Sequence, residues 1–179
     1  MRIIAGKYRG RVIHTPKGLP VRPTTDRTKE SLFNILSHRL DWEDCKVLDL
    51  FSGTGNISLE CWSRGAKSVV SVDQNARCVA AIRAAMSALR ITGAEVIKMN
   101  AFSYVRQQQG EVFDLVFMDP PYAMARQPEL VEAILNNDLL ANDGLLVVEH
   151  SSQNQLAQVA GFEMTKIYGS SSISFFGKP

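Results

Sequence analysis

From residue 46 onward the chain alternates short apolar runs with amphipathic stretches, and this alternation restricts its fold more than any other feature. Apolar runs typical of buried strands fall at residues 46–50, 68–73, 94–99, 113–118 and 144–149. Helix candidates lie between them, near residues 56–64, 75–90, 101–109 and 127–137. Strands that alternate with helices predict βαβ units with right-handed crossovers. The expected fold is α/β, a doubly wound, Rossmann-like and mostly parallel sheet.

The two ends of the chain extend this pattern differently. A further helix is predicted near residues 152–160, followed by strands near 162–168 and 172–177. The segment between those strands is too short for a parallel crossover, so they are expected to form an antiparallel hairpin. Upstream, a helix is predicted over residues 26–39, with Thr25 or Asp26 as its N-cap. A chain of 179 residues is long enough to bury a substantial core.

The first thirty residues are strongly basic, although the whole chain has a net charge of only +2. Apolar residues interleave with these charges around Gly6 and Gly10, which predicts a short hairpin or a pair of strands over residues 2–14. A solvated, disordered tail is the alternative, but such tails rarely contain so many large apolar residues. We therefore expect residues 1–24 to form a basic β-hairpin extension that binds a polyanion, and residues 25–179 to form the main domain. The basic residues are Arg2, Lys7, Arg9, Arg11, Lys17, Arg22, Arg27 and Lys29, against the acids Asp26 and Glu30.

Several classes of protein are disfavoured by composition. The three cysteines are widely spaced, with no C-x-x-C pair, which argues against a disulfide framework and a zinc site. The three histidines are also scattered, so no metal site is predicted. No apolar run approaches the length of a membrane span, and the first residues lack the apolar core of a secretory signal. A cytoplasmic protein is the expectation.

A glycine-containing loop, Asp49-Leu50-Phe51-Ser52-Gly53-Thr54-Gly55, follows the first strand of the predicted sheet. Glycines there allow close approach of a nucleoside, and the following helix start offers free N–H groups. The dinucleotide fingerprint requires a third glycine where this chain has Ser58. Asp73, at the end of the second strand, is suited to accept hydrogen bonds from ribose hydroxyls. A ribose without a pyrophosphate favours S-adenosylmethionine over NAD.

Each of these acids also has a simpler interpretation. Asp49 is placed either to attract the methionine ammonium group or to cap the loop, and Asp73 either binds ribose or caps a helix. Asn100, with Ala101 after it, either contacts an adenine edge or caps the helix that starts at residue 101. In a doubly wound sheet the C-terminal ends of neighbouring strands open on one crevice. The loop, Asp73, Asn100 and the segment after the fourth strand are therefore expected around one site.

That last segment is Asp119-Pro120-Pro121-Tyr122, directly after the apolar run 112–118. The Asp119 carboxylate and the Pro120 carbonyl are two acceptors suited to the two N–H bonds of an exocyclic amine. Proline fixes its own φ angle and removes a competing donor. Tyr122 supplies a ring on which a base can stack. The alternative is a strand end followed by a Pro-Pro turn.

Together these motifs resemble class I S-adenosylmethionine-dependent methyltransferases, and in particular the RsmD family, which methylates the N2 amine of a guanine in 16S ribosomal RNA. The resemblance covers nearly the whole chain. It includes the opening residues 1–6, the segment 9–11, the loop 49–55, the segment 63–66 and residues 119–122. Its most discriminating part is Arg22-Pro23-Thr24-Thr25-Asp26-Arg27. The resemblance implies a seven-stranded sheet with an antiparallel last strand.

The resemblance also implies roles for individual residues and a partner. The partner is 16S rRNA within a 30S subunit or an assembly intermediate, and a monomer is expected. Implied catalytic residues are Asp119, Pro120, Pro121 and Tyr122; implied cofactor-binding residues are Asp49, Phe51, Ser52, Gly53, Thr54, Gly55, Asp73, Asn100, Ala101 and Asp119; implied RNA-binding residues are Arg2, Lys7, Arg9, Arg11, Arg22, Thr24 and Arg27.

The chain departs from the family pattern at three positions. Asn100 stands where relatives often have aspartate, Asn56 replaces a small residue, and Ser52 replaces alanine. Other functions remain compatible with parts of the pattern. These are an adenine-N6 DNA methyltransferase, for which the chain lacks room for a separate target-recognition domain, and a non-catalytic RNA-binding ribosome assembly factor. A protein glutamine methyltransferase is disfavoured because that family typically begins the 119–122 motif with asparagine.

Overall fold

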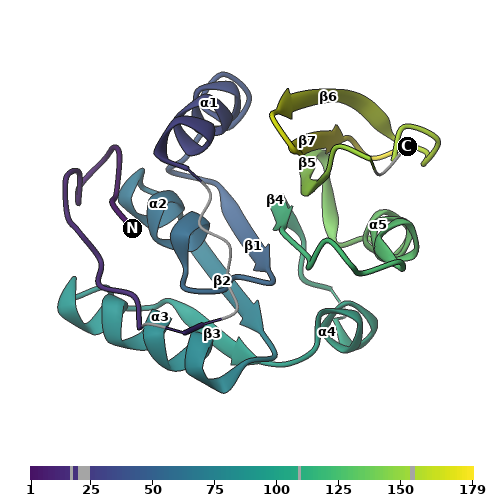
Figure 1. Cartoon of the computed structure of the whole chain (residues 1–179). Helices are drawn as coiled ribbons and strands as arrows, with labels where there is room; N and C mark the ends of the chain where they lie inside the picture. Colours follow the sequence, from purple (N-terminus) through teal and green to yellow (C-terminus); the bar gives the residue numbers. More distant parts are fainter. Residues whose placement is uncertain (17, 20–24, 109, 154–155) are drawn as a thin grey trace.

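A computed structural model describes residues 1–16, 18–19, 25–108, 110–153 and 156–179. Its centre is a seven-stranded sheet with the strand order β3-β2-β1-β4-β5-β7-β6 (Figure 1). The five strands from β3 to β5 are parallel, and β7 and β6 complete the sheet in antiparallel pairing. The strands are β1 (Lys46–Leu50), β2 (Ser68–Asp73), β3 (Glu95–Lys98), β4 (Phe113–Met118), β5 (Leu140–Ser151), β6 (Phe162–Tyr168) and β7 (Ser171–Phe176).

Helices cover both faces of the sheet, as predicted for a doubly wound fold (Figure 1). On one face lie α1 (Asp26–Leu36), α2 (Asn56–Ser63) and α3 (Ala76–Ala88). On the other lie α4 (Ala101–Gln107) and α5 (Gln127–Asn136). The N-cap of α1 is Thr25, whose side chain accepts a hydrogen bond from the Thr28 N–H.

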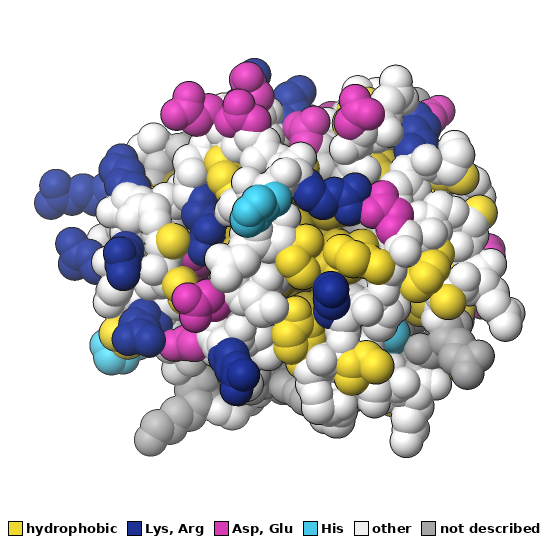
Figure 2. Space-filling model, turned by 90° about the horizontal axis from the view of Figure 1, so that it is seen from above, with side chains coloured by type: hydrophobic (Ala, Val, Ile, Leu, Met, Phe, Trp, Pro, Cys, Tyr) yellow, Lys and Arg dark blue, Asp and Glu magenta, His cyan; other side chains and the backbone are white. Residues whose placement is uncertain are grey.

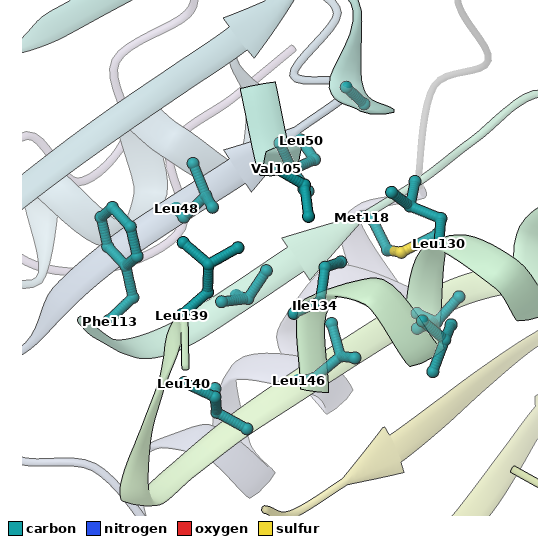
Figure 3. Packing of buried hydrophobic residues seen from close by; sticks show 14 of the residues in the cluster. Leu48, Leu50, Val105, Phe113, Met118, Leu130, Ile134, Leu139, Leu140 and Leu146 are labelled. Atoms are coloured by element: carbon teal, nitrogen blue, oxygen red, sulfur yellow. The ribbon is translucent and has the colours of Figure 1, made fainter. Parts of the chain in front are cut away.

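Alternating side chains of the strands supply a core to each face. Leu50 lies beside Val105 of α4, and Met118 lies beside Leu130 of α5, in a core that also contains Leu48 and Ile134 (Figure 3). The intervening residues of the same strands form a second core against α1 and α2. Because both faces are covered, the central strands are apolar throughout, and this explains why their limits are readable from the sequence.

The C-terminal hairpin is confirmed: β6 and β7 pair antiparallel from Tyr168 opposite Ser171 to Phe162 opposite Phe176. β7 also pairs antiparallel with β5 and so lies between β5 and β6. β5 is longer than the predicted strand 144–149, since it begins at Leu140. Its pairing with β4 shifts register between Phe113 and Leu115, an irregularity that the apolar pattern does not signal.

The helix predicted near residues 152–160 is wrong. The described residues of this segment form turns, with i→i+3 bonds from the Val159 N–H to the Leu156 carbonyl and from the Phe162 N–H to the Val159 carbonyl. The Ser152 N–H donates to the Ser170 carbonyl of the terminal hairpin. A helix this short is marginal without tertiary support, and here the N–H groups of Val159 and Phe162 bond within turns instead.

The N-terminal arm, residues 1–14, folds back on itself as predicted but forms a single bridge, between Arg2 and Val12, in place of regular strands. Its backbone N–H groups are used by α2. The N–H groups of Ile4 and Ala5 donate to the Glu60 carboxylate, and the Lys7 N–H donates to the Ser63 carbonyl. The arm is therefore held to the domain by its own main chain, which leaves few backbone groups for a β ladder.

Beneath the arm, Lys29 of α1 is buried against Glu60 of α2, with 1% and 0% of their side chains exposed. The Lys29 Nζ lies 3.3 Å from a Glu60 carboxylate oxygen and 2.6 Å from the Arg2 carbonyl. The other Glu60 oxygen lies 3.0 Å from Arg64 Nε. Burial lowers the pKa of Lys29, and the Glu60 carboxylate acts against this lowering. We call these contacts between residues 2–8, Lys29, Glu60, Ser63 and Arg64 the arm seam.

Candidate cofactor and substrate site

A cavity of about 400 Å³ lies at the C-terminal ends of β2, β1 and β4. The strand order reverses here, since β1 has β2 on one side and β4 on the other. Ligands of doubly wound sheets bind at such a reversal. The cavity is lined by Asp49, Phe51, Ser52, Gly53, Thr54, Asn56, Ile57, Asp73, Gln74, Asn75, Cys78, Phe117, Asp119, Pro120, Pro121 and Tyr122.

The loop after β1 turns sharply into the cavity wall. Phe51 has a φ of 60°, which is uncommon for a residue with a side chain, and Gly53 and Gly55 also have positive φ values. A Cβ atom at Gly55 would lie 3.0 Å from the Ile82 side chain, so α3 leaves little room there. Gly55 itself does not line the cavity. Its part is to let the loop pass close to α3 before α2 begins.

Asp73 joins this loop to the second strand. One carboxylate oxygen accepts a hydrogen bond of 2.8 Å from the Gly53 N–H, and the other accepts one of 2.7 Å from the Asn75 N–H. The N-cap of α3 is Asn75. Each Asp73 oxygen retains a second lone pair, so the carboxylate, which lines the cavity, has acceptor capacity beyond these two bonds.

Asp49 is buried beneath the same loop. Its carboxylate accepts hydrogen bonds from the Ser58 N–H, at 3.0 Å, and from the Ser58 hydroxyl, which in turn accepts from Ser71. Burial raises the pKa of Asp49 to about 7, although both Ser58 hydrogen bonds act in the opposite direction. The Ser58 contacts make Asp49 a structural acid that ties β1 to α2. It also lines the cavity, so both interpretations offered by the sequence stand.

Asn100 takes the capping role that the sequence offered as one alternative. Its side-chain oxygen accepts from the Phe102 and Ser103 N–H groups at the start of α4, and its amide nitrogen donates to Gln74. Neither Asn100 nor Ala101 is among the residues that line the cavity. Gln74, which does line it, links Asn100 to the cavity wall through this hydrogen bond.

The Asp119–Tyr122 segment leaves β4 and lines a further part of the cavity wall. The Pro121 carbonyl accepts a hydrogen bond of 2.8 Å from the Met124 N–H, which closes a turn. No described residue donates to the carbonyl of Pro120, a buried residue. The Tyr122 hydroxyl lies 2.6 Å from the Ser171 hydroxyl at the start of β7. The segment is thus a Pro-Pro turn, and all four of its residues line the cavity.

The described RNA-binding candidates lie in two places, on the arm and on α1. Arg2, Lys7, Arg9 and Arg11 are exposed on the arm, and Arg2 pairs with Asp26 at 3.2 Å. Figure 2 shows basic side chains gathered at the left of the molecule, the side on which Figure 1 places the arm. Arg27 is also exposed and lines a separate groove between α1 and β6. Arg22 and Thr24 lie outside the described residues.

Sequence reasoning missed several residues of the cavity wall. Gln74 and Asn75 directly follow Asp73, so their position beside a predicted ligand residue was an available signal. Cys78 carried no such signal, and burial raises the pKa of its thiol. In the described ranges, no three His, Cys, Asp or Glu side chains come together to hold a metal ion. Among the same residues, no helix is long and apolar enough to cross a membrane.

Comparison with known proteins shows which family the chain is similar to. The family model described as "Conserved hypothetical protein 95" matches residues 1–177. The "Putative rRNA methyltransferase YlbH" of Bacillus subtilis is 31% identical over 186 residues, which cover 99% of each chain. The "Ribosomal RNA small subunit methyltransferase D" of Escherichia coli K12 is 33% identical over 159 residues, which cover 89% of this chain and 79% of the relative.

Solved structures agree with the sequence relatives. A putative methyltransferase of Escherichia coli, yhhF, superimposes with a TM-score of 0.88 at 32% identity and covers 100% of this chain and 99% of its own. The 16S rRNA N2 G1207 methyltransferase RsmC of Thermus thermophilus, in complex with AdoMet and guanosine, has a TM-score of 0.69 at 20% identity. The match covers 90% of this chain and 46% of RsmC, and it concerns the fold. The chain belongs to the RsmD family, the family of the model that matches residues 1–177, and has the fold of class I methyltransferases.

Proposed function

We propose that the protein transfers a methyl group from S-adenosylmethionine to the exocyclic N2 amine of a guanine in 16S rRNA. The observation that carries this proposal is that two sets of residues, one suited to the cofactor and one suited to the base, line the same cavity. The loop after β1 and Asp73 form one part of its wall, and Asp119–Tyr122 form a second part. A cofactor held by the first wall and a base held by the second would meet between β1 and β4. The curated relatives named as small-subunit rRNA methyltransferases support the substrate class.

The first wall suits this cofactor. Asp73 has acceptor capacity for ribose hydroxyls, and the Ser52 hydroxyl is buried in the loop with no partner among the described residues. Polar groups that are buried in this way normally find a partner. S-adenosylmethionine, when bound, supplies an electrophilic methyl group on a sulfonium. Asp49 lies at the end of β1, where a cationic ammonium group would oppose the desolvation of its carboxylate.

The second wall suits a planar amine. Its lone pair is delocalised into the base, so the amine is a weak nucleophile. The Asp119 carboxylate and the Pro120 carbonyl would accept its two N–H bonds and localise the lone pair on nitrogen. Because the amine becomes acidic only as it is methylated, Asp119 would take the proton late. The chain's main contribution would be alignment, which is worth up to about 7–11 kcal/mol in favourable cases.

Tyr122 and the N-terminal arm would act on the RNA. A guanine must leave its stack to reach the cavity, at a cost of a few kcal/mol, and the Tyr122 ring would stack on the extruded base. The exposed arm residues Arg9 and Arg11 would hold phosphates. Residues 1–24 then serve as an RNA-binding extension of a methyltransferase domain, which works in the cytoplasm as a monomer on a 30S subunit or its assembly intermediate.

The test is transfer of labelled methyl from S-adenosylmethionine to undermethylated small ribosomal subunits, naked 16S RNA and duplex DNA in parallel. Digestion to nucleosides then identifies the product. The proposal predicts label on N2-methylguanosine from one of the RNA substrates. Label on DNA adenine would show an adenine-N6 methyltransferase instead. Cofactor binding with no label on any of the three would contradict the proposal and favour an assembly factor.

A further inference from the structure

Asn56 is the first residue of α2 and lines the cavity. Its side-chain oxygen lies 2.9 Å from the buried Lys29 Nζ. The same ammonium group is within reach of the Arg2 carbonyl, at 2.6 Å, and of the Glu60 carboxylate, at 3.3 Å. Lys29 therefore has three acceptors for its three N–H bonds, and Asn56 is one of them.

This contact fixes which way the Asn56 amide faces. An ammonium group is a donor only, so the Asn56 atom beside it must be the carbonyl oxygen and not the amide nitrogen. The Asn56 nitrogen is then turned away from Lys29. Within the described part of the chain, no group accepts a hydrogen bond from it. The cavity wall thus contains an oriented, uncommitted N–H donor.

The chemistry of the cofactor indicates what this donor meets. The sulfonium and the ammonium of S-adenosylmethionine are cationic and its nucleoside is neutral, so the carboxylate is its one anionic group. Asn56 is also at the start of a helix, where free backbone N–H groups favour an anion. The buried Ser52 hydroxyl, which has no partner among the described residues, lies in the same loop. All three features favour an anionic group at this end of the cavity.

We propose that Asn56 is a cofactor-binding residue whose amide N–H binds the carboxylate of the methionine moiety, in an orientation set by Lys29. This inference rests on the proposed use of S-adenosylmethionine but not on the RNA substrate. Lys29 also holds the Arg2 carbonyl, so the arm seam and the cofactor cavity share one ammonium group. The seam thereby orients a residue of the cavity.

The test compares two ligands by isothermal titration calorimetry. S-adenosylhomocysteine contains the amino-acid end, whereas 5′-methylthioadenosine has the same nucleoside and sulfur without it. We expect Asn56→Ala to weaken S-adenosylhomocysteine binding by about tenfold, the effect of one hydrogen bond to a charged group, and to leave 5′-methylthioadenosine binding unchanged. Asn34→Ala, at an exposed position of α1, is the control and should change neither affinity.

A second variant separates the loss of a contact with the ligand from a change in loop conformation caused by the loss of the Lys29 contact. Asn56→Asp keeps an acceptor for Lys29 but places a carboxylate against a carboxylate, so S-adenosylhomocysteine should bind more weakly than to Asn56→Ala. Thermal melting of each variant confirms that it is folded. Equal losses for both ligands, or an unchanged affinity of Asn56→Asp for S-adenosylhomocysteine, would overturn the proposal. These assays contain no RNA, so a failure of the rRNA methylation proposal would be seen separately.

Discussion

The arm seam and the cofactor cavity both contain buried polar groups, but they satisfy them to different degrees. In the seam, the Glu60 carboxylate accepts from the Ile4 and Ala5 N–H groups and pairs with Lys29 and Arg64. In the cavity wall, the Ser52 hydroxyl, the Asn56 amide nitrogen and the Pro120 carbonyl find no partner among the described residues. Polar groups that hold a fold are normally saturated. Trp62 Nε1 and the Tyr104 hydroxyl are also buried without a partner among the described residues, but neither residue lines the cavity, so Ser52 is the one of these three that a ligand there would reach.

The two buried acids sharpen this contrast. Glu60 has two cations beside it, whereas Ser58 alone among the described residues donates to Asp49, whose pKa is raised to about 7 by burial. The Glu60 carboxylate is therefore compensated by cations, whereas burial disfavours the charged form of Asp49. A buried acid that lowers the stability of the free protein is expected at a functional site, where a bound ligand supplies the missing partner.

The largest effect is expected for Glu60→Ala, which leaves the Lys29 ammonium buried without its carboxylate. Removal of one partner of a buried pair costs about 3–5 kcal/mol. The matched control is Asp44→Ala, which breaks an exposed pair with Lys67 at 3.2 Å and should cost about 0–1 kcal/mol. Urea unfolding measures both. Equal losses would mean that the seam is no more important than a surface pair.

A pH series on Asp49 should show an effect of opposite sign to that of a paired acid. Its folded-state pKa is raised, so the folded protein holds the proton more tightly than the unfolded chain does. The stabilisation is present below the ordinary pKa of aspartate, near 4, and is lost as pH rises through about 7. Relative to Asp49→Asn, the free energy of unfolding should fall by up to about 1.4 kcal/mol per pH unit in that window. A pH-independent difference between the two proteins would contradict it.

Two glycines of the arm, Gly6 and Gly10, offer a closely matched pair of substitutions, for which a smaller difference in the free energy of unfolding is expected. Both have positive φ values, but a Cβ at Gly6 would lie 1.7 Å from the Ser63 carbonyl oxygen, while one at Gly10 would meet nothing within 4 Å. Gly10→Ala should cost about 1–2 kcal/mol for the left-handed backbone alone. Gly6→Ala should cost about 1–3 kcal/mol more, because the arm must move from α2. Thermal or urea unfolding of both variants decides whether the seam is tightly packed.

The smallest effect on the folded protein is expected from the exposed arm charges. Arg9→Ala with Arg11→Ala should leave the free energy of unfolding nearly unchanged, since surface substitutions usually fall within about 0.5 kcal/mol. RNA affinity should become less dependent on salt, with the slope reduced by roughly 0.7–0.9 for each phosphate that the arm no longer binds. Filter binding at several salt concentrations measures this. An unchanged slope would place the RNA elsewhere on the surface.

Much of this contrast was readable from the sequence, but not all of it. The limits of β1, β2 and β4 follow from apolar runs with polar ends, and the strand-end rule predicted a common site for Asp73 and Asp119. The 152–160 helix failed because a segment this short is marginal as a helix on its own, and a local pattern does not show which tertiary contacts would support it. Lys29 lies on the apolar face of α1, where a charged side chain is unusual. Its partner Glu60 is set by tertiary packing, which single-sequence patterns do not specify.

The most direct test of the two-walled site is Asp119→Ala, measured for methyl transfer to undermethylated small subunits and for S-adenosylmethionine affinity on the same preparation. We predict that transfer falls by about a thousandfold or more, because the base amine is no longer aligned, and that the dissociation constant for the cofactor changes little. Transfer at the rate of the unmodified protein would contradict the role of the β4 wall in catalysis. Loss of cofactor binding would instead make Asp119 a cofactor ligand and assign both walls to one molecule.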